Sequence, residues 1–457
     1  MDTLIRVAQF ILSLSILVVL HEFGHYITAR MFKTRVEKFY LFFDFLFPFP
    51  NLLNFALFKK KIGDTEYGLG WFPLGGYVKI AGMIDESMDE EFLKSEPQPW
   101  EFRSKKAWQR LIIMLGGITM NVILAWVIYS LMLYYWGESR FPVENVKYGF
   151  AADSTAQSFG LMDGDKIISY NGGKKFKNAD KVGLEMLINN AKTLEIDRAG
   201  EKKTLTIPKS VYKDILANKG DGFMVPLIPC VVDSVKPESP LAKAGGKKGD
   251  RIIQLDSIHT EYYQQFKKEL KNFKGTSTSV LVERADGNKK DTMRLDVAVP
   301  DSAILGFYVE NDPGKIFTID EIHYGFFESF PMGAKKTYEQ FIGYTKQIRL
   351  IFDPELKGYK QVGSFFTIGQ QFSARWDWQR FWMLTAFLSI ALAFVNLLPI
   401  PGLDGGHALF TLVEMVTGRA PNEKFLERAQ MVGMIIIFGL MIFALSNDVL
   451  RIFFGRH

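Results

Sequence analysis

Apolar residues gather in four long stretches of the chain, at about residues 4–29, 111–136, 381–400 and 429–454. Each stretch is long enough to cross a hydrocarbon core of about 30 Å as an α-helix. A secretory signal peptide is the alternative for the first stretch, but that stretch is too long, and HEFGHYITAR stands where a small-residue cleavage site would lie. The pattern therefore predicts a polytopic α-helical membrane protein with four transmembrane helices.

Basic residues beside these stretches predict the orientation of the chain in the membrane. Clusters of Lys and Arg follow the first stretch, precede the second and lie between the last two: Arg30, Lys33, Arg35, Lys38, Arg103, Lys105, Lys106, Arg110, Arg419, Lys424 and Arg428. Because such clusters stay on the cytoplasmic side, we expect the N-terminus, the long segment 137–380 and the C-terminus on the outer side. The C-terminal RIFFGRH runs mildly against this rule.

The segment 137–380 contains an internal repeat. GLMDGDKII at 160–168 aligns with GGKKGDRII at 245–253, an offset of 85 residues. An offset of this size fits one small domain rather than a solenoid unit. Both copies resemble PDZ domains, in which a groove beside a sheet edge accepts an extended peptide. We therefore expect two tandem α+β PDZ-like domains, at 140–222 and 223–305.

Composition and charge limit the partners and the kind of metal site that the chain can have. The chain has 457 residues, 48% of them hydrophobic, and a net charge of +5 without a long basic block, so nothing favours nucleic acid as a partner. Cys230 is the lone cysteine, which excludes an intramolecular disulfide and a cysteine-based metal site. A metal site would have to use histidines and carboxylates.

Two histidines and a glutamate stand inside the first apolar stretch, as HEFGH at 21–25. His21 and His25 are four residues apart, so a helix places both imidazoles on one face, as two ligands of one zinc ion require. Glu22 can then act as a base without being a ligand. A charged side chain at membrane depth costs about 2.5–3.5 kcal/mol, which favours a functional site over a polar cluster that only joins helices.

Catalytic zinc takes three protein ligands and leaves one position open, so a third ligand is required. Candidates at membrane depth lie in NLLPIPGLDGGH at 396–407, where two prolines interrupt the third apolar stretch. By chemistry alone, either Asp404 or His407 would serve.

Four motifs together resemble the site-2 protease family of intramembrane zinc metalloproteases, in the branch with two PDZ domains between the second and third spans. They are HEFGH, PLGGYVKI at 73–80, LGGITMN at 115–121 and NLLPIPGLDGGH. The resemblance implies His21, His25 and Asp404 as zinc ligands, Glu22 as the catalytic base and His407 in a supporting role. Asn396 matches an asparagine implicated in holding the substrate backbone, for which its amide offers a donor and an acceptor. A helix–helix hydrogen bond is the alternative role for Asn396.

The glycine-rich stretch EYGLGWFPLGGYVKI at 66–80 has alternating Tyr, Leu, Trp and Tyr residues and a Pro-Leu-Gly-Gly bend, which predicts a β-hairpin. The resemblance implies a sheet that re-enters the membrane beside the zinc, with Gly75 and Gly76 at the substrate-binding edge. A soluble hairpin on the cytoplasmic face is the alternative. We also expect an interfacial or re-entrant segment at 39–58 and interfacial amphipathic helices at 321–350, broken at Pro331.

The resemblance extends over essentially the whole chain. It implies membrane helices and a re-entrant β region at 1–136, the two PDZ-like domains, a linker at 306–377 and the last two spans at 378–457. VGSFFTIG at 362–369 departs from the Gly-Pro-Ile-Gly motif common in the family, which leaves details of the substrate loop open.

The implied function is regulated intramembrane proteolysis in the bacterial inner membrane. Substrates would be single-pass membrane proteins, such as an anti-sigma factor or a remnant signal peptide, with membrane lipid as the other partner. The PDZ domains would lie on the periplasmic side and act as a size filter, while the zinc site would lie toward the cytoplasm. A catalytically silent PDZ-bearing adaptor is the alternative, but no ligand is lost. A transporter would show repeated halves within the membrane, and we find no second span resembling HExxH.

Overall fold

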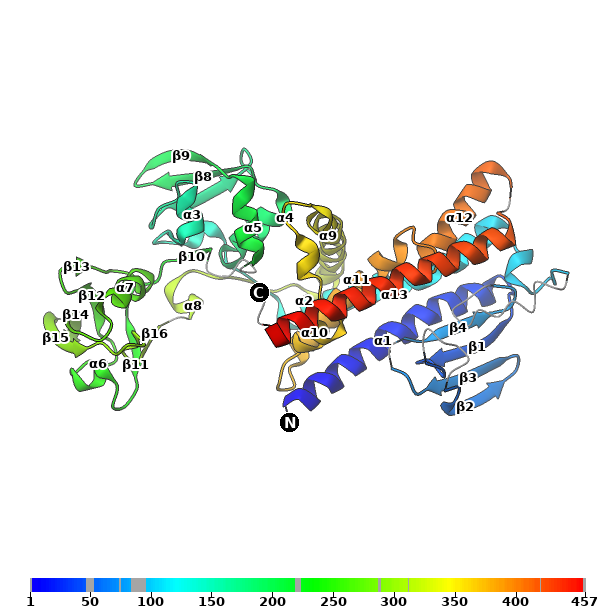
Figure 1. Ribbon diagram of the computed structural model, residues 1–457, viewed down its shortest axis with the longest axis horizontal. Helices are drawn as coiled ribbons and strands as arrows, with labels where there is room; N and C mark the ends of the chain where they lie inside the picture. The colour runs from blue at the N-terminus through cyan, green and yellow to red at the C-terminus, as the bar shows by residue number, and fades with distance from the viewer. Residues whose placement is uncertain are drawn as a thin grey trace. The chain divides into compact units, whose positions relative to one another are not determined.

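The computed structural model describes residues 2–46, 53–73, 75–83, 96–217, 223–286, 289–310, 312–419 and 421–454 (Figure 1). Contacts between residues divide the chain into two compact units. We call them the helical unit (Met1–Gly137, His323–Phe352 and Gly358–His457) and the inserted unit (Glu138–Ile322 and Asp353–Lys357). Most of the long segment between the second and third predicted spans therefore forms a unit of its own.

Among the described residues, four helices of the helical unit are long and apolar enough to cross a membrane: α1 (Asp2–Met31), α2 (Ala107–Trp136), α11 (Trp378–Leu397) and α13 (Glu423–Phe454). They match the predicted spans to within a few residues at each end. Helix α2 contacts α1, α11, α9 (Phe326–Phe352) and the short α12 (Asp404–Thr417), so it lies at the centre of the unit. The part of the unit that the structure describes also contains the short helices η2 (Phe102–Ser104), η6 (Gly358–Gln361) and α10 (Phe365–Gln370).

Helices α1 and α2 approach closely at glycines. A Cβ atom on Gly24 would lie 2.8 Å from the backbone nitrogen of Gly117, and one on Gly116 would lie 2.7 Å from Thr28 Oγ1. Small residues at such crossings let the backbones of membrane helices come together. This crossing brings α2 directly against the HEFGH face of α1.

A four-stranded sheet lies along α1, in the order β2-β3-β1-β4 (Figure 1). Its strands are β1 (Val36–Leu41), β2 (Ala56–Ile62), β3 (Thr65–Gly70) and β4 (Tyr77–Ile80). The predicted hairpin at 66–80 is therefore wrong, because β1 lies between β3 and β4 and pairs with both. The tight turn is one element earlier, where Gly63 has a φ of 61° between the antiparallel β2 and β3. The segment 39–58 supplies the end of β1 and the start of β2, and its residues 47–52 lie outside the described part of the chain.

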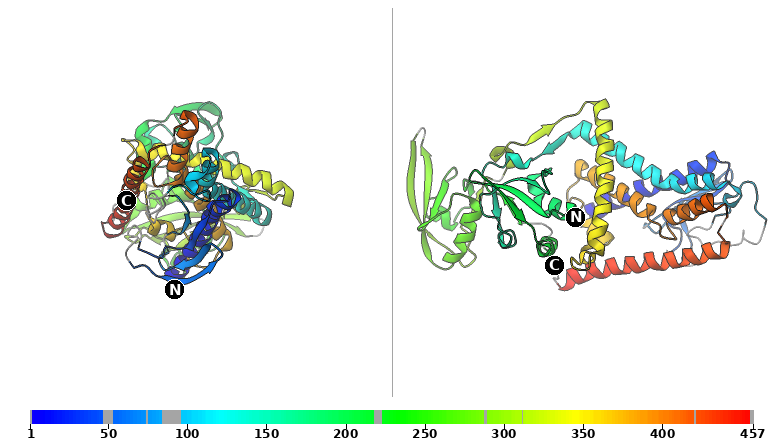
Figure 2. Two further views of the ribbon diagram at one scale, coloured as in Figure 1. Left: turned by 90° about the vertical axis from the view of Figure 1, so that its right-hand side faces the viewer. Right: turned by 90° about the horizontal axis from the view of Figure 1, so that it is seen from above.

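Helix α9 is one continuous helix with Pro331 inside it, so the predicted break at this proline is wrong. Pro331 lies close to the N-terminal end of the helix, and a proline there removes a single hydrogen bond. Interhelical contacts outweigh this loss. Gly333 lies against Ser130 of α2, and Trp126 Nε1 donates a hydrogen bond to the carbonyl oxygen of Phe330 at 2.8 Å. The second view in Figure 2 shows α9 crossing the direction of the long helices of its unit.

The inserted unit contains two successive α+β modules. The first comprises β6 (Phe150–Ala152), α3 (Ser154–Ser158), β7 (Lys166–Tyr170), η4 (Ala179–Lys181), α4 (Val182–Asn189), β8 (Thr193–Arg198), β9 (Glu201–Thr206), α5 (Lys209–Ala217) and β10 (Met224–Pro226). The second comprises β11 (Val232–Val235), α6 (Pro240–Lys243), β12 (Arg251–Leu255), β13 (Ile258–His259), α7 (Tyr263–Leu270), η5 (Lys271–Phe273), β14 (Ser277–Asp286), β15 (Lys289–Ala298) and β16 (Phe307–Val309). The remaining elements of the unit are β5 (Glu138–Arg140), η3 (Val143–Asn145), α8 (Pro313–Ile316) and β17 (Asp320–Ile322), which pairs with β5.

Strand pairing places the module boundaries a few residues beyond the expected ones. Strand β10 pairs with β6, so residues 224–226 complete the first module although they follow the expected boundary at 222. Likewise, β16 pairs with β11 and extends the second module past 305. The repeat motif alone could not place these strands, because each pairs with a strand far away in the sequence.

The internal repeat is built around the same buried ion pair in both modules. Asp165 binds Arg198 through both carboxylate oxygens at 2.7 Å, and Asp250 binds Arg284 in the same way. Each arginine also donates a hydrogen bond to the carbonyl oxygen of a glycine, Gly160 or its repeat counterpart Gly245. The aspartates are those of the two Gly-Asp motifs, so the repeat seen in the sequence corresponds to a repeated contact.

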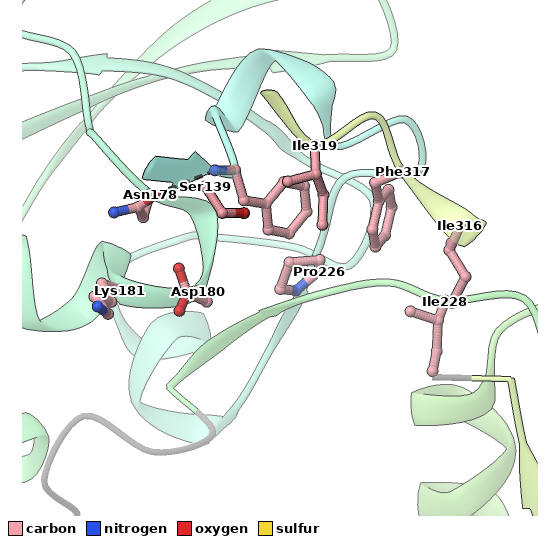
Figure 3. A pocket seen from close by; sticks show the side chains of 10 residues that line it. Ser139, Asn178, Asp180, Lys181, Pro226, Ile228, Ile316, Phe317 and Ile319 are labelled. Atoms are coloured by element: carbon pink, nitrogen blue, oxygen red, sulfur yellow. Dashed lines mark hydrogen bonds between the residues drawn. The ribbon is translucent and has the colours of Figure 1, made fainter. Parts of the chain in front are cut away.

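A pocket of about 380 Å³ opens in the inserted unit (Figure 3). Its walls are largely apolar, with polar side chains on one side, and the lining residues are Ser139, Phe141, Asn178, Asp180, Lys181, Pro226, Ile228, Ile316, Phe317 and Ile319. The pocket therefore lies where the end of β10 meets η4, the turn that leads into α4.

Candidate active site

His21 and His25 lie on the buried face of α1 and are both less than a tenth exposed. Their rings are arranged edge to face, with centroids 5.0 Å apart. His25 Nδ1 lies 2.9 Å from the carbonyl oxygen of Ile113 on α2. A carbonyl oxygen can only accept, so Nδ1 carries the proton and the Nε2 lone pair of His25 is left for a metal ion.

Asp404 joins the two histidines from the first turn of α12. Its Oδ2 lies 3.3 Å from His21 Nε2 and 3.2 Å from His25 Nε2. The ligand atoms of the three residues all lie within 4.8 Å of one another. His407, the other candidate, stands three residues further along α12 and is not part of this cluster.

This donor set fits zinc. Two imidazole nitrogens and one carboxylate oxygen are the ligands of hydrolytic zinc sites, which keep a fourth position open. Neighbouring ligand atoms in a tetrahedron with bonds of about 2.05 Å are separated by about 3.3 Å, close to the nitrogen–oxygen distances seen here. The three residues are therefore spaced to hold one zinc ion.

Asn121 of α2 also lies beside the candidate ligands, although no role was predicted for it. It is fully buried, and its side-chain amide lies 3.1 Å from His21 Nδ1. The amide oxygen has no hydrogen-bond partner among the described residues. Because the oxygen and nitrogen of an amide can exchange places by a flip, Oδ1 can accept the Nδ1 proton of His21. Asn121 would then orient His21 as the Ile113 carbonyl orients His25. In the sequence, the feature that could have pointed to Asn121 is a polar amide within an apolar span, in the motif LGGITMN.

Asn396, near the end of α11, places its Nδ2 3.1 Å from His21 Nε2. Asn396 therefore lies beside the candidate ligands, and its role in holding the substrate backbone stays a prediction. A nitrogen lone pair that binds a metal cannot also accept this hydrogen bond, so metal binding to His21 would free the amide of Asn396 for another partner.

Glu22 lies beside His21 on α1 and is partly exposed. Its place next to His21 is where the predicted catalytic base would stand, and that role stays a prediction.

Glycines bring the neighbouring elements close to the site. A Cβ atom on Gly117 of α2 would lie 2.6 Å from His21 Cε1. One on Gly76 would lie 2.6 Å from both Val18 Cγ1 and the carbonyl oxygen of Tyr40, and one on Gly75 would lie 2.5 Å from Phe43 Cε2. The sheet can thus pack on α1 one turn before His21. Close packing is therefore enough to explain why positions 75 and 76 are glycines. The role of Gly75 and Gly76 in substrate binding stays a prediction.

Comparison with known proteins agrees with this geometry. The model of peptidase family M50 matches residues 9–440. The regulator of sigma-E protease RseP of Escherichia coli K12 is 27% identical over 97% of this chain and 98% of its own length. Protease RseP of Yersinia pestis is 28% identical over 99% of this chain and its full length. A Neisseria meningitidis relative, whose name describes a candidate zinc metalloprotease, is 29% identical over 97% of this chain and 98% of its own length. The chain therefore belongs to peptidase family M50, and it is a zinc metalloprotease with membrane-spanning helices.

Proposed function

We propose that this protein cleaves single-pass membrane proteins within or next to their membrane-spanning segment. In this proposal His21, His25 and Asp404 hold zinc, and Glu22 is the catalytic base. The main observation in its support is that the three candidate ligand atoms, on α1 and α12, lie close together. Helix α1, which holds two of the three residues, is itself a candidate membrane span. A metal site in such a helix is suited to substrates that are also in the membrane.

The chemistry divides between the metal and the protein. Zinc, when bound, supplies Lewis acidity that activates water and polarises the scissile carbonyl. Glu22 takes a proton from the attacking water and later returns it to the leaving amine nitrogen, as general base and then general acid. The Ile113 carbonyl and Asn121 keep the two imidazoles oriented, so the ligand set is held before substrate arrives.

The substrate must be extended when it is cut, because a helix keeps its peptide groups in internal hydrogen bonds. Two features support binding of an extended segment. Strand β4 is an edge strand of the sheet along α1, so its outer side can pair with a substrate backbone. The amide of Asn396 offers a donor and an acceptor to a peptide group that water cannot reach. Residues that weaken a helix near the cut should therefore favour cleavage.

The inserted unit is proposed to select substrates. Its two modules share the Asp–Arg contact and resemble PDZ domains, and they stand between the second and third spans. We propose that they lie on the periplasmic side of the inner membrane and keep bulky outer domains away from the site. Substrates would then be proteins already shortened on that side, such as an anti-sigma factor, in line with the sigma-E relatives, or a remnant signal peptide. Deleting residues 138–310 should permit cleavage of a substrate that still carries its outer domain, and unchanged selectivity would contradict the filter.

Cleavage of a tagged single-span substrate by the purified protein in detergent tests the catalytic proposal. Wild-type protein should cut the substrate, while Glu22→Gln and chelator treatment should each abolish the cut. Glu22→Gln should keep its zinc, because Glu22 is not a ligand, whereas Asp404→Asn should lose zinc and activity together. Wild-type protein that binds zinc and substrate but leaves the substrate intact would contradict the proposal and favour an adaptor.

A further inference from the structure

The loop that leads into Asp404 is enclosed between two helices. On one side are the glycines of α12: a Cβ atom on Gly405 would lie 2.6 Å from the carbonyl carbon of Leu397, and one on Gly406 would lie 2.7 Å from Pro401 Cα. Inside the loop, Leu403 donates its backbone N–H to the carbonyl oxygen of Ile400 at 3.0 Å. Asp404 is the first residue of α12, so the position of this loop sets the position of the carboxylate.

The other side of the loop rests on α13 with no side chain between the two backbones. Gly433 of α13 is buried, and a Cβ atom built on it would coincide with the carbonyl group of Pro401. Gly402, in the loop, lies against the same part of α13. A Cβ atom on it would lie 3.4 Å from the backbone nitrogen of Met434 and 3.6 Å from the carbonyl oxygen of Gln430. Gly402 also has a φ of 93°, which side-chain-bearing residues rarely adopt.

The far end of α13 is fixed independently. Asp448 accepts hydrogen bonds from the backbone nitrogen of Ser364 and from the hydroxyl groups of Ser364 and Thr367, at the start of α10. Asn447 Nδ2 donates to the carbonyl oxygens of Tyr359 and Val362. The helix is therefore anchored near its C-terminal end, beyond Gly433, and a side chain added at Gly433 would press on the loop.

We propose that Gly433 is a positioning residue for the zinc site. By letting α13 touch the backbone of Pro401, it fixes the loop that holds Asp404 toward His21 and His25. The last membrane helix thereby takes part in metal binding, although it contributes no ligand. This inference rests on the proposed role of Asp404 as a zinc ligand.

The chain offers a matched control in the same helix. Gly439 also lies in α13, but it is exposed, and a Cβ atom on it would meet no atom of the described residues within 4 Å. Gly433→Ala and Gly439→Ala therefore make the same chemical change in the same helix, and only the change at Gly433 touches the loop.

Zinc affinity of the full-length purified variants, measured by competition with a chromophoric chelator, tests the proposal. Gly433→Ala should bind zinc about 10–100-fold more weakly, the range for residues that orient metal ligands, while Gly439→Ala should match the wild type. The absorption bands of the cobalt-substituted protein should change in Gly433→Ala and stay the same in Gly439→Ala. Equal zinc affinity and equal cobalt spectra in the two variants would overturn the proposal.

Two further variants separate the explanations. Asp404→Asn should lose zinc; if it binds zinc normally, the proposed ligand set itself is wrong. If it loses zinc while Gly433→Ala does not, only the role of Gly433 is wrong. Gly402→Ala strains the loop backbone, because Gly402 has a φ of 93°, and leaves α13 unchanged, so it should also weaken zinc binding. A Gly433→Ala protein that unfolds, together with a folded Gly402→Ala protein that binds zinc normally, would overturn the proposal as well.

Discussion

At the scale of single residues, the Nδ1 atoms of the two histidines of HEFGH face different kinds of polar group. His25 Nδ1 faces a backbone carbonyl, which no substitution removes, whereas His21 Nδ1 faces the side-chain amide of Asn121. The proposed ligand set is therefore open to mutation on the His21 side.

We expect Asn121→Ala to weaken zinc binding about 10–100-fold and to lower activity in parallel, because His21 loses the group that holds its ring. Asn121→Asp should retain much of the affinity, since a carboxylate still accepts the Nδ1 proton. Ser130→Ala is a control on the same helix: Ser130 is also buried, but its hydroxyl group bonds to the carbonyl oxygen of Trp126. Chelator competition measures all three proteins, and similar affinities for Asn121→Ala and Ser130→Ala would argue against the role of Asn121.

The residues that could be predicted at this scale are those whose spacing is local. His21, Glu22 and His25 follow from one turn of one helix, and an HExxH pattern in an apolar stretch signals them. Residue spacing left Asp404 and His407 as alternatives, because the choice depends on how the loop after α11 enters α12. Asn121 and Gly433 received no role, since each acts across a helix contact that the sequence does not show.

At the scale of elements, buried hydrogen bonds join α1, α2 and α11. We call the residues that form them the seam: Ser13, Asn121, Thr385 and Ser389. Thr385 Oγ1 of α11 donates to Ser13 Oγ of α1 at 2.9 Å, and Ser389 Oγ of α11 donates to the carbonyl oxygen of Asn121 on α2 at 2.7 Å. All of these side chains are fully buried. The seam fixes how α1, α2 and α11 lie against one another and thereby where His21, Asn121 and Asn396 meet.

Replacing Thr385 by Val should destabilise the helical unit only modestly, by about 0.6 kcal/mol and at most about 1.7 kcal/mol, as for other hydrogen bonds between membrane helices. The shape of the side chain is kept, while the bond to Ser13 is lost. Thr417→Val is the control, because Thr417 is exposed and donates to Val413 within its own helix. Unfolding in mixed micelles with increasing SDS measures the difference, and a loss above about 3 kcal/mol would show that the seam does more than join helices.

The membrane spans were predictable as elements because a run of about twenty apolar residues indicates a transmembrane helix. The sheet was less predictable. Its strands were visible between 66 and 80, but their pairing was not, because β1 enters the sheet from before this stretch and separates β3 from β4. The continuity of α9 through Pro331 likewise depends on contacts with α2.

At the scale of the whole molecule, the two modules of the inserted unit carry the same ion pair, and the core of the second module is formed by residues of that module. Cys230 belongs to the core of the second module and is fully buried. Burial raises the pKa of its thiol, which lowers the fraction of reactive thiolate at neutral pH. The lone cysteine of the chain is therefore a specific reporter of opening in the second module.

Arg284→Ala should expose this reporter. It leaves the carboxylate of Asp250, which is 1% exposed, without its charged partner, and breaking such a pair costs about 3–5 kcal/mol. We expect Cys230 of the wild type to resist alkylation and Cys230 of Arg284→Ala to react much faster, as followed by mass spectrometry. Arg198→Ala removes the matching partner of Asp165 in the first module and should leave the alkylation rate close to that of the wild type. Equal acceleration in both variants would mean that the modules open together, and the inserted unit would then act as a single body in the proposed selection of substrates rather than as two independent domains.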